Sequence, residues 1–496
     1  MTGSLSPNVS RVYLSMQALS CHAYLVRHVF HGRLVHSVCG RRGEQGKSRY
    51  LPMTERDKQQ MCAAIGIRST DELFADIPEE VRFRGELHLP RPLDELALTK
   101  HMAQLAEKNA HAATHVSFLG AGTYEHYIPS VVNHMISRSE FYTAYTPYQP
   151  EISQGELQAI FEFQTMICEL TAMDVANSSM YDGPTALAEA AAMAFGLGKA
   201  DKIIVSRAVH PESRAILHTY AQGLGMDIVE IGLEDGVTKL EDLEQAVDDR
   251  TAAVIVQYPT FLGHLEDLAA VEQITHAAKN GLMIVSANPL ALGILQPPGA
   301  FGADVVVGDV QPFGIPASFG GPHCGYFAAR QKFMRKIPGR LVGQTTDENG
   351  RRGFVLTLQA REQHIRREKA TSNICSNQAL NAIAASVAMS ALGKSGVQKM
   401  AMLNVQKAQY AKRQLSRAKG IQVAHEQPFF NEFAIKMNQP VKAVSARLLD
   451  KGFLGGYDLG RDYSEYDGHM LVAVTETRTK EEIDRFVHAL EVISNE

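Results

Sequence analysis

The densest group of side chains that could do chemistry lies between residues 142 and 156. Three tyrosines stand there among threonine, glutamine and serine residues and two prolines. Proline restricts the backbone to extended conformations, while phenol and amide groups form directional hydrogen bonds. Such a stretch packs poorly into a core, so it predicts a functional loop rather than surface decoration. Its candidate residues are Tyr142, Tyr145, Thr146, Tyr148, Gln149, Ser153 and Gln154.

A second polar stretch, residues 361–373, is basic, with four cations against two acids. Its side chains could contact a carboxylate or a phosphate, because both anions bind paired cationic donors. The candidates for such contacts are Arg361, His364 and Arg366. A solvated helix face explains the same pattern equally well.

A third candidate is Gly183, which precedes Pro184 and Thr185 at the start of an alanine-rich helical pattern. The free backbone N–H groups of a helix N-terminus can bind a phosphate, and proline fits the first helical turn. Taken alone, the pattern favours an ordinary helix start over a phosphate loop.

Other catalytic motifs are incomplete. The paired glycines at 120–122 and 196–198 lack the third glycine of a dinucleotide-binding fingerprint, and no GxSxG motif occurs. His111 and His115 are four residues apart, but the residue after His111 is not glutamate and no third ligand is near. This spacing therefore predicts a pair on a helix surface rather than a metal site.

The elements that would position these residues alternate between strand and helix patterns. Five short segments rich in valine and isoleucine are separated by stretches long enough for helices, which predicts a buried parallel sheet with right-handed connections. The segments are Lys202–Ser206, Asp227–Ile231, Ala252–Gln257, Leu282–Ser286 and Asp304–Val307. An alanine-rich stretch to Ala418 then predicts one or two helices. Strand patterns at Phe433–Met437 and His469–Val474 around a further helix predict a smaller α+β domain.

We expect four parts along the chain: a basic extension (1–47), a helical arm (48–95), a large α/β domain (96–345) and a small C-terminal α+β domain (346–496). In the arm, Thr54 followed by Asp57 predicts a capped helix, and Ser69 begins a second capping pattern.

Residues 1–47 differ from the rest in composition. Their six cations against one acid are typical of a transit peptide, which would imply an organelle. Because the segment shows no sustained helical period, an upstream start codon with the protein beginning near Tyr50 is the favoured interpretation.

The chain has 496 residues, of which 45% are hydrophobic and 21% charged, with a net charge of −5. At about 150 residues per domain this length predicts two or three domains, and the balanced charge excludes strongly basic nucleic-acid binders. No apolar run approaches the ~20 residues of a membrane span. The six scattered cysteines lack CxxC spacing, which is typical of a reducing compartment. We therefore expect a soluble, cytoplasmic α/β enzyme or enzyme subunit.

Several long blocks of this sequence resemble the P-protein family of the glycine cleavage system, the pyridoxal-phosphate-dependent glycine decarboxylases. The resemblance covers the chain from Tyr50 to its C-terminus and implies the aspartate-aminotransferase-like fold (fold type I), with a large parallel-sheet domain and a small C-terminal domain. In many bacteria this protein is split in two, and the chain is similar to the first subunit, α. The matching blocks are Tyr145–Thr171, Met180–Ala190, Ala208–Arg214, Phe301–Ala328 and Gln359–Leu380.

Pyridoxal phosphate requires a lysine that holds its aldehyde as a Schiff base and an acid beside the pyridine nitrogen. In the family fold the acid ends one strand and the lysine follows the next, which here are Leu282–Ser286 and Asp304–Val307. The first strand runs on to Asn288 without a carboxylate, and no lysine occurs between Lys279 and Lys332. The resemblance therefore implies no catalytic residue in this chain.

The resemblance also implies a vestigial cofactor pocket in this chain. His210 stands where a ring-stacking residue is expected, Gly183 and Thr185 where a phosphate loop is expected, and Asn288 after the strand that lacks the acid. The covalently bound cofactor is then expected in a second subunit, β, which pairs with this chain as αβ and further as α2β2. The tyrosine-rich loop is expected to line the active site at that interface.

The reaction implied for the assembly is decarboxylation of glycine, followed by transfer of the aminomethyl group to the lipoyl arm of H-protein. Neither a metal, a nucleic acid nor a membrane is expected as a partner. The alternative is a non-enzymatic structural or regulatory paralogue that kept the fold after losing the cofactor. The retained tyrosine-rich loop and the basic stretch at 361–373 favour the enzyme subunit.

Overall fold

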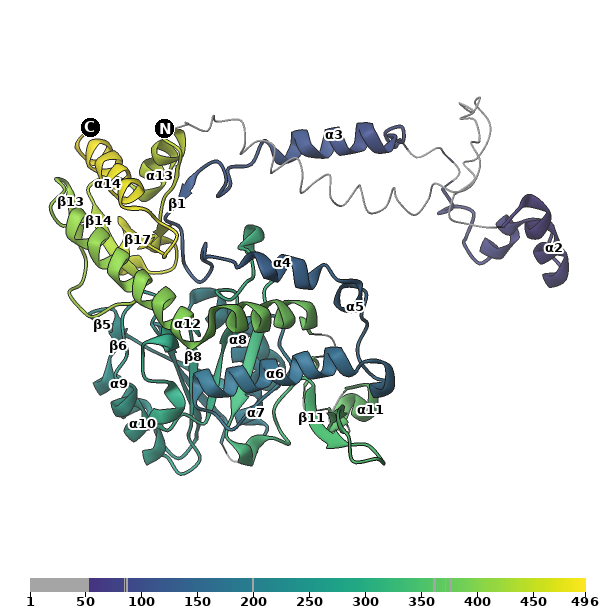
Figure 1. The fold of residues 1–496 in the computed structure, drawn as a ribbon, viewed down its shortest axis with the longest axis horizontal. Helices are drawn as coiled ribbons and strands as arrows, with labels where there is room; N and C mark the ends of the chain where they lie inside the picture. Colours follow the sequence, from purple (N-terminus) through teal and green to yellow (C-terminus); the bar gives the residue numbers. More distant parts are fainter. Residues whose placement is uncertain are drawn as a thin grey trace, which may run out of the picture. The chain divides into compact units, whose positions relative to one another are not determined.

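The computed structural model describes residues 53–83, 85, 88–198, 200–359, 363–370, 372–374 and 377–496 (Figure 1). By its internal contacts the chain divides into two units, Met1–Glu95 and Leu96–Glu496. The predicted basic extension, residues 1–47, lies outside the described residues. Within the described ranges, no helix is long and apolar enough to cross a membrane.

The N-terminal unit contains α2 (Glu55–Ile65) and the 3-10 turn η1 (Thr70–Phe74). Thr54 caps α2 as predicted: its hydroxyl accepts from the Asp57 N–H at 3.2 Å, and the Asp57 carboxylate accepts from the Thr54 N–H at 2.7 Å. Ser69 caps η1 by accepting from the Asp71 N–H at 3.2 Å, although the second predicted helix is only this short turn. Helix α3 (Glu95–Ala106) begins at the boundary between the two units along the chain.

The second unit is built on a seven-stranded sheet in the order β2-β10-β9-β8-β7-β3-β4. All five predicted strands occur, and neighbours from β4 to β9 pair in parallel, as the valine-rich and isoleucine-rich segments predicted. Strand β10 runs antiparallel to both β9 and β2. The strands are β2 (Val175–Ala176), β3 (Lys202–Ser206), β4 (Asp227–Ile231), β7 (Thr251–Tyr258), β8 (Leu282–Ala287), β9 (Val305–Asp309) and β10 (Gly325–Ala329).

Helices cover both faces of this sheet. Successive strand residues point to opposite faces, so Met283 and Val285 enter one core while Ile284 enters the other. Helices α6 (Gln154–Thr171) and α10 (Leu268–Ala277) pack on the first core, and α7 (Gly183–Phe195) and α8 (Pro211–Leu224) on the second. Burial on both faces explains why the strands are continuous apolar runs rather than alternating ones.

Helix α12 (Ala379–Leu415) connects the sheet to the small C-terminal domain. Its backbone breaks at Gly393, where φ is 62°, so the predicted alanine-rich segment forms two helical parts. The first part contributes Ala384 to the sheet's first core, and the second contributes Leu415 to the core of the small domain.

The small domain is a four-stranded antiparallel sheet in the order β13-β14-β17-β16, covered by α13 and α14. This arrangement confirms the predicted α+β pattern near the C-terminus. A capping box of Thr479 and Glu482 begins α14. The elements are β13 (Ile421–Val423), β14 (Glu432–Met437), α13 (Val441–Asp450), β16 (Tyr457–Asp458), β17 (His469–Ala473) and α14 (Lys480–Asn495).

Shorter elements complete the second unit. Strand β1 (Val116–Ser117) pairs in parallel with β15 (Phe453–Leu454), which attaches the chain after α3 to the small domain. Two antiparallel pairs lie outside the main sheets, β5 with β6 and β11 with β12. The remaining bounds are α4 (Ser130–Ile136), α5 (Ser139–Tyr142), β5 (Leu233–Glu234), β6 (Val237–Thr238), α9 (Leu240–Ala246), β11 (Leu341–Thr346), β12 (Arg352–Thr357) and α11 (Gln363–Arg366).

Candidate functional site

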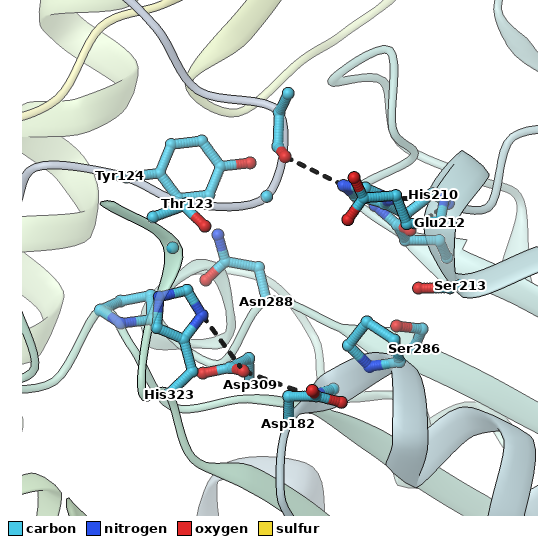
Figure 2. Close-up of a pocket in the computed structure, with 18 of the residues that line it drawn as sticks. Thr123, Tyr124, Asp182, His210, Glu212, Ser213, Ser286, Asn288, Asp309 and His323 are labelled. Carbon is cyan, nitrogen blue, oxygen red and sulfur yellow. Dashed lines mark hydrogen bonds and ion pairs between the residues drawn. The ribbon is translucent and has the colours of Figure 1, made fainter. Parts of the chain in front are cut away.

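A cavity of about 390 Å³ opens at the carboxyl ends of β7, β8 and β9. Open parallel sheets bind their ligands at this edge, so we call it the sheet-edge cavity. Figure 2 shows polar side chains from loops far apart in the sequence pointing into it. The residues labelled there are Thr123, Tyr124, Asp182, His210, Glu212, Ser213, Ser286, Asn288, Asp309 and His323.

Two carboxylates accept hydrogen bonds from the backbone N–H groups at the start of α7. Asp182 is the N-cap, and its side chain accepts from the Thr185 N–H at 2.8 Å. Asp309, the last residue of β9, accepts from the Gly183 N–H at 3.2 Å. A Cβ at Gly183 would lie 3.2 Å from the Asp309 backbone nitrogen, so helix and strand touch here. Amides that could bind a phosphate are therefore used by the chain's own carboxylates.

The Asp309 carboxylate is held by further groups around it. It accepts from the Gln311 N–H at 2.8 Å and the Cys324 N–H at 3.4 Å, and it lies 3.8 Å from His323 Nδ1. Burial raises the pKa of Asp309 above its ordinary value, although His323 and the backbone N–H groups act in the opposite direction. The free-energy cost of burying the charged Asp309 carboxylate exceeds the stabilisation that these contacts give it.

His210 caps α8 and borders the opposite side of the cavity (Figure 2). Its Nδ1 accepts from the Glu212 N–H at 3.1 Å, and its Nε2 donates to the Ala121 carbonyl at 2.9 Å. These two bonds require the neutral tautomer with the proton on Nε2. Burial also lowers the pKa of His210, so the ring is neutral and held within the protein, with its edge packed on Phe261.

The cavity wall formed by residues 121–124 is held by a carboxylate from the small domain. Glu432 accepts from the Ala121 N–H at 2.7 Å and from the Tyr124 hydroxyl at 2.5 Å. Burial raises the pKa of Glu432 to about 7, although both hydrogen bonds lower it. A Cβ at Gly263 would lie 2.0 Å from the Glu432 carbonyl oxygen, so only glycine permits this approach of the two domains.

Pyridoxal phosphate does not fit the sheet-edge cavity. None of the described residues that line it is a lysine or an arginine, so neither the aldehyde nor the phosphate meets a cationic group. Asp182, Glu212 and Asp309 instead present three carboxylates, which repel a phosphate dianion. Strand β8 ends without an acid, as the sequence indicated, whereas β9 extends to Asp309, whose carboxylate borders the cavity.

The four residues predicted as a vestigial cofactor pocket separate into two groups. Gly183, His210 and Asn288 line the sheet-edge cavity. Thr185 lies inside the first turn of α7, where its N–H is bonded to Asp182, so it supports the helix start rather than the cavity surface.

The tyrosine-rich loop leads from α5 through the 3-10 turn η2 (Pro150–Ile152) into α6. Tyr145 is 82% exposed and Tyr142 is 68% exposed. Aromatic rings exposed to this degree are typical of a surface that binds a partner. Five of the seven predicted residues line an open cavity of about 680 Å³, namely Tyr145, Thr146, Tyr148, Gln149 and Ser153.

Tyr145 and Thr146 also border a second cavity of about 360 Å³, which we call the loop cavity. Arg340 lines it and is only 6% exposed. Its guanidinium donates to the Tyr148 hydroxyl at 3.1 Å and lies 5.5 Å from the centre of the Tyr148 ring. Glu156 is 8% exposed, and burial raises the pKa of its carboxyl to about 7.

Gln154 has a structural role that the loop's composition did not indicate. Its side-chain oxygen accepts from the Phe354 N–H at 2.9 Å, and its nitrogen donates to the carbonyls of Phe354 and Pro150 at 2.8 and 2.7 Å. The amide therefore extends the edge of β12 and holds the loop in place. Its predicted place in the active-site loop at the subunit interface stays a prediction.

Of the predicted anion contacts, Arg361 and the side chain of His364 lie outside the described residues. Arg366 ends α11 with an exposed side chain, and its contact with an anion remains a prediction.

The predicted helix pair of His111 and His115 is wrong. Helix α3 ends at Ala106, where the Asn109 side chain donates to the last carbonyls. The two histidines then lie in a turn in which the Thr114 N–H donates to the His111 carbonyl at 2.8 Å. Across the described ranges, no group of three or more histidine, cysteine, aspartate or glutamate residues could hold a metal ion.

Three residues that the sequence did not indicate now stand out: Asp309, Glu156 and Arg340. Asp309 was detectable, because it follows a predicted strand and the carboxyl ends of parallel strands border ligand sites. Glu156 was detectable as the acid that ends the tyrosine-rich stretch. Arg340 carries no local signal, because its contact with Tyr148 joins segments 192 residues apart.

The comparisons with known proteins agree with this geometry. The family model "Glycine cleavage system P-protein" matches residues 48–490. The "Probable glycine dehydrogenase (decarboxylating) subunit 1" of Brevibacillus brevis is 65% identical over 449 residues, which cover 90% of this chain and 99% of that one. A crystal structure of glycine decarboxylase (P-protein) of the glycine cleavage system, in inhibitor-bound form, matches with a TM-score of 0.83 and 43% identity over 90% of this chain and 99% of that one.

A more distant solved structure, glutamate decarboxylase of Lactobacillus brevis, shares the fold with a TM-score of 0.63 at 12% identity. The architecture is therefore fold type I of the pyridoxal-phosphate-dependent enzymes, as predicted. With a family match over nearly the whole chain and a closely similar relative covered from end to end, the chain belongs to the P-protein family of the glycine cleavage system.

Proposed function

We propose that this chain is the α subunit of glycine dehydrogenase (decarboxylating) and that it is active only with a second subunit, β, that carries the cofactor lysine. The observation that supports this most directly is the sheet-edge cavity. Its described lining has no lysine or arginine, and Asp182 and Asp309 occupy the helix N-terminus where a phosphate would bind. The name "subunit 1" of the Brevibacillus brevis relative supports a two-subunit enzyme.

The part of this chain that would contact substrate is the tyrosine-rich loop. Tyr145 and Tyr148 expose 82% and 44% of their surface. Both line the open cavity of about 680 Å³, and Tyr145 also lines the loop cavity. Interfaces between obligate subunits commonly bury about 2,000–5,000 Å² and are rich in aromatic residues. We infer that β covers this loop and that the phenol groups then face its cofactor, in an α2β2 assembly in the cytoplasm.

In that assembly the pyridoxal phosphate of β supplies the electron sink for loss of carbon dioxide from glycine, and H-protein's lipoyl arm accepts the aminomethyl group. The α subunit orients the substrate. Neutral hydroxyl donors at Tyr145 and Tyr148 can bind a carboxylate without giving up a proton, and the Arg340 guanidinium fixes the Tyr148 hydroxyl.

The experiment is Tyr145→Phe in the complex with β, assayed by glycine decarboxylation. The substitution removes one hydroxyl and keeps the ring, so assembly should be intact. A lost hydrogen bond to a charged substrate is worth about 1.5–3 kcal/mol, or roughly a 10- to 100-fold fall in kcat/KM. Tyr127→Phe is the matched control. Tyr127 is also exposed, at 55%, but it lines neither the loop cavity nor the open cavity of about 680 Å³.

Unchanged turnover in Tyr145→Phe, Tyr148→Phe and Gln149→Ala alike would show that the loop packs against β without serving the reaction. A non-enzymatic paralogue would give a different result: a stable complex with β whose glycine turnover does not depend on whether this chain is present.

A further inference from the structure

The open cavity of about 680 Å³ beside the tyrosine-rich loop is bordered by a buried acid. This acid is Glu156, in the first turn of α6, and it is only 8% exposed. The same residue lines the loop cavity, so space reaches it from both cavities. Acids are almost never buried to this degree unless they are paired, so the position of Glu156 needs a reason.

Glu156 does not make the hydrogen bond that its place in the helix offers. Ser153 and Glu156 have the spacing of a capping box, in which the glutamate carboxylate accepts from the N–H of the serine. Here the Ser153 N–H donates to the Pro150 carbonyl at 3.2 Å instead, and the Ser153 side chain makes no cap bond. The Glu156 carboxyl is therefore not used at the end of its own helix.

No other donor takes the place of the serine. In the part of the chain that the structure describes, no N–H or O–H group lies within hydrogen-bond distance of the Glu156 carboxyl oxygens, and burial alone raises the pKa of this group, to about 7. An ionised carboxylate that is buried without donors is costly. A cation that enters the adjoining space would remove that cost.

The charged groups that line the two cavities with Glu156 already have partners. Glu140 of α5 lines the open cavity and pairs with Arg138 at 2.6 Å. Arg340 lines the loop cavity just before β11 and donates to the Tyr148 hydroxyl at 3.1 Å. The residues that the start of α12 adds to the loop cavity are uncharged, namely Ala379, Leu380 and Asn381.

The rest of the open cavity fits the long side chain of an arginine or a lysine. Within the described residues, its lining contains neither of these cations. The alkyl stem of a cationic side chain packs on apolar surface, and the face of an aromatic ring attracts its charged end. The apolar and aromatic side chains of the lining are Phe141, Tyr145, Tyr148 and Ile152.

We propose that β inserts a cationic side chain, an arginine or a lysine, into the open cavity, where its charged end pairs with the Glu156 carboxylate. The proposal deepens the proposed function and rests on it for the identity of the partner. The cavity is continuous with the exposed ring of Tyr145, which we assign to the interface with β. Arginine and aromatic side chains that meet in desolvated pockets supply much of the binding free energy of such interfaces.

The test measures the Kd of the complex between this chain and β, by fluorescence-detected sedimentation over a dilution series. Glu156→Gln keeps the shape of the side chain and removes its charge, so the cation of β stays unpaired. At pH 8 this variant should raise Kd about 10- to 100-fold, as expected for the loss of a charged hydrogen bond. The matched control is Glu151→Gln, an exposed acid of the same loop outside the lining of the open cavity, which should keep the wild-type Kd.

The pH dependence of Kd provides a second readout. The pairing requires an ionised carboxylate, so association should weaken as Glu156 takes up a proton in the free chain. With a pKa of about 7, the Kd of wild type should rise about tenfold from pH 8 to pH 6. Glutamine has no proton to bind, so Glu156→Gln should lack this tenfold change, whereas Glu151→Gln should retain it.

A Kd that Glu156→Gln leaves within twofold of wild type at pH 8 would overturn the proposal. A carboxylate that binds glycine instead would give that result together with a higher KM. A lower free energy of unfolding for the Glu156→Gln chain alone would also overturn it, because it would assign the carboxyl to a contact within this chain.

Failure of this inference differs from failure of the proposed function. A complex that decarboxylates glycine but whose Kd does not respond to Glu156→Gln loses only the inference about the open cavity. A wild-type complex that forms without decarboxylating glycine contradicts the proposed function itself.

Discussion

Glu432→Gln should reveal how the small domain holds the wall of the sheet-edge cavity. Burial raises the pKa of Glu432 from its usual 4.5 to about 7. The folded protein therefore binds this proton more tightly than the unfolded chain does. The resulting contribution to stability is fully present below pH 4.5 and is lost as pH rises to about 7.

The size of the effect follows from the same shift. At about 1.4 kcal/mol per pH unit, ionising Glu432 in the folded state costs roughly 3 kcal/mol by pH 8. Glutamine has no proton to lose, so this cost disappears in the variant. The amide oxygen can still accept from the Ala121 N–H, and the amide nitrogen can donate to the Tyr124 oxygen, so both contacts that hold the wall survive.

The assay is the free energy of unfolding of wild type and Glu432→Gln at pH 5 and pH 8. The variant should gain roughly 2.5 kcal/mol relative to wild type between the two pH values, because a small part of the cost is already present at pH 5. Glu348→Gln, which neutralises an exposed acid of the hairpin between β11 and β12, should show no such gain. Parallel pH profiles for wild type and Glu432→Gln would refute the assignment of a buried, proton-binding carboxyl at this position.

Two further outcomes follow from the contacts. Burial lowers the pKa of His276, but its bonds to Asp304 and a second carboxylate outweigh this and raise it. His276→Ala should therefore cost about 1 kcal/mol below pH 6.5 and progressively less as pH rises through the folded pKa, as thermal unfolding at several pH values would show. Gly263→Ala should abolish soluble expression, because its φ is +90° and the new Cβ would meet the Glu432 backbone. Gly350→Ala, with a φ of +74° and open space around it, should cost only about 1–2 kcal/mol.

The main sheet was predictable because its strands are buried on both faces. Such strands are continuous runs of valine and isoleucine, and each predicted run became a strand. The residues at which the strands end were harder to predict. Strand β9 continues through Gly308 to Asp309, and neither residue type favours strands. The local pattern therefore stopped at Val307, and the carboxylate that the extension places in the sheet-edge cavity was missed.

Side-chain roles in the loop were less predictable than its existence. The density of tyrosine and proline indicated a functional loop, but it could not show which side chains face outward. Gln154 is bonded to Phe354, 200 residues away, and Arg340 reaches Tyr148 from a segment with no unusual composition. Contacts at such separations are set by the tertiary fold, which no local period encodes.

The position of the covalently bound cofactor tests the central claim most directly. The complex of this chain with its β subunit would be reduced with borohydride in the presence of pyridoxal phosphate, and the label located by peptide mass spectrometry. The lining of the sheet-edge cavity predicts one labelled lysine in β and no specific label in this chain. Stoichiometric labelling of a single lysine here would contradict it.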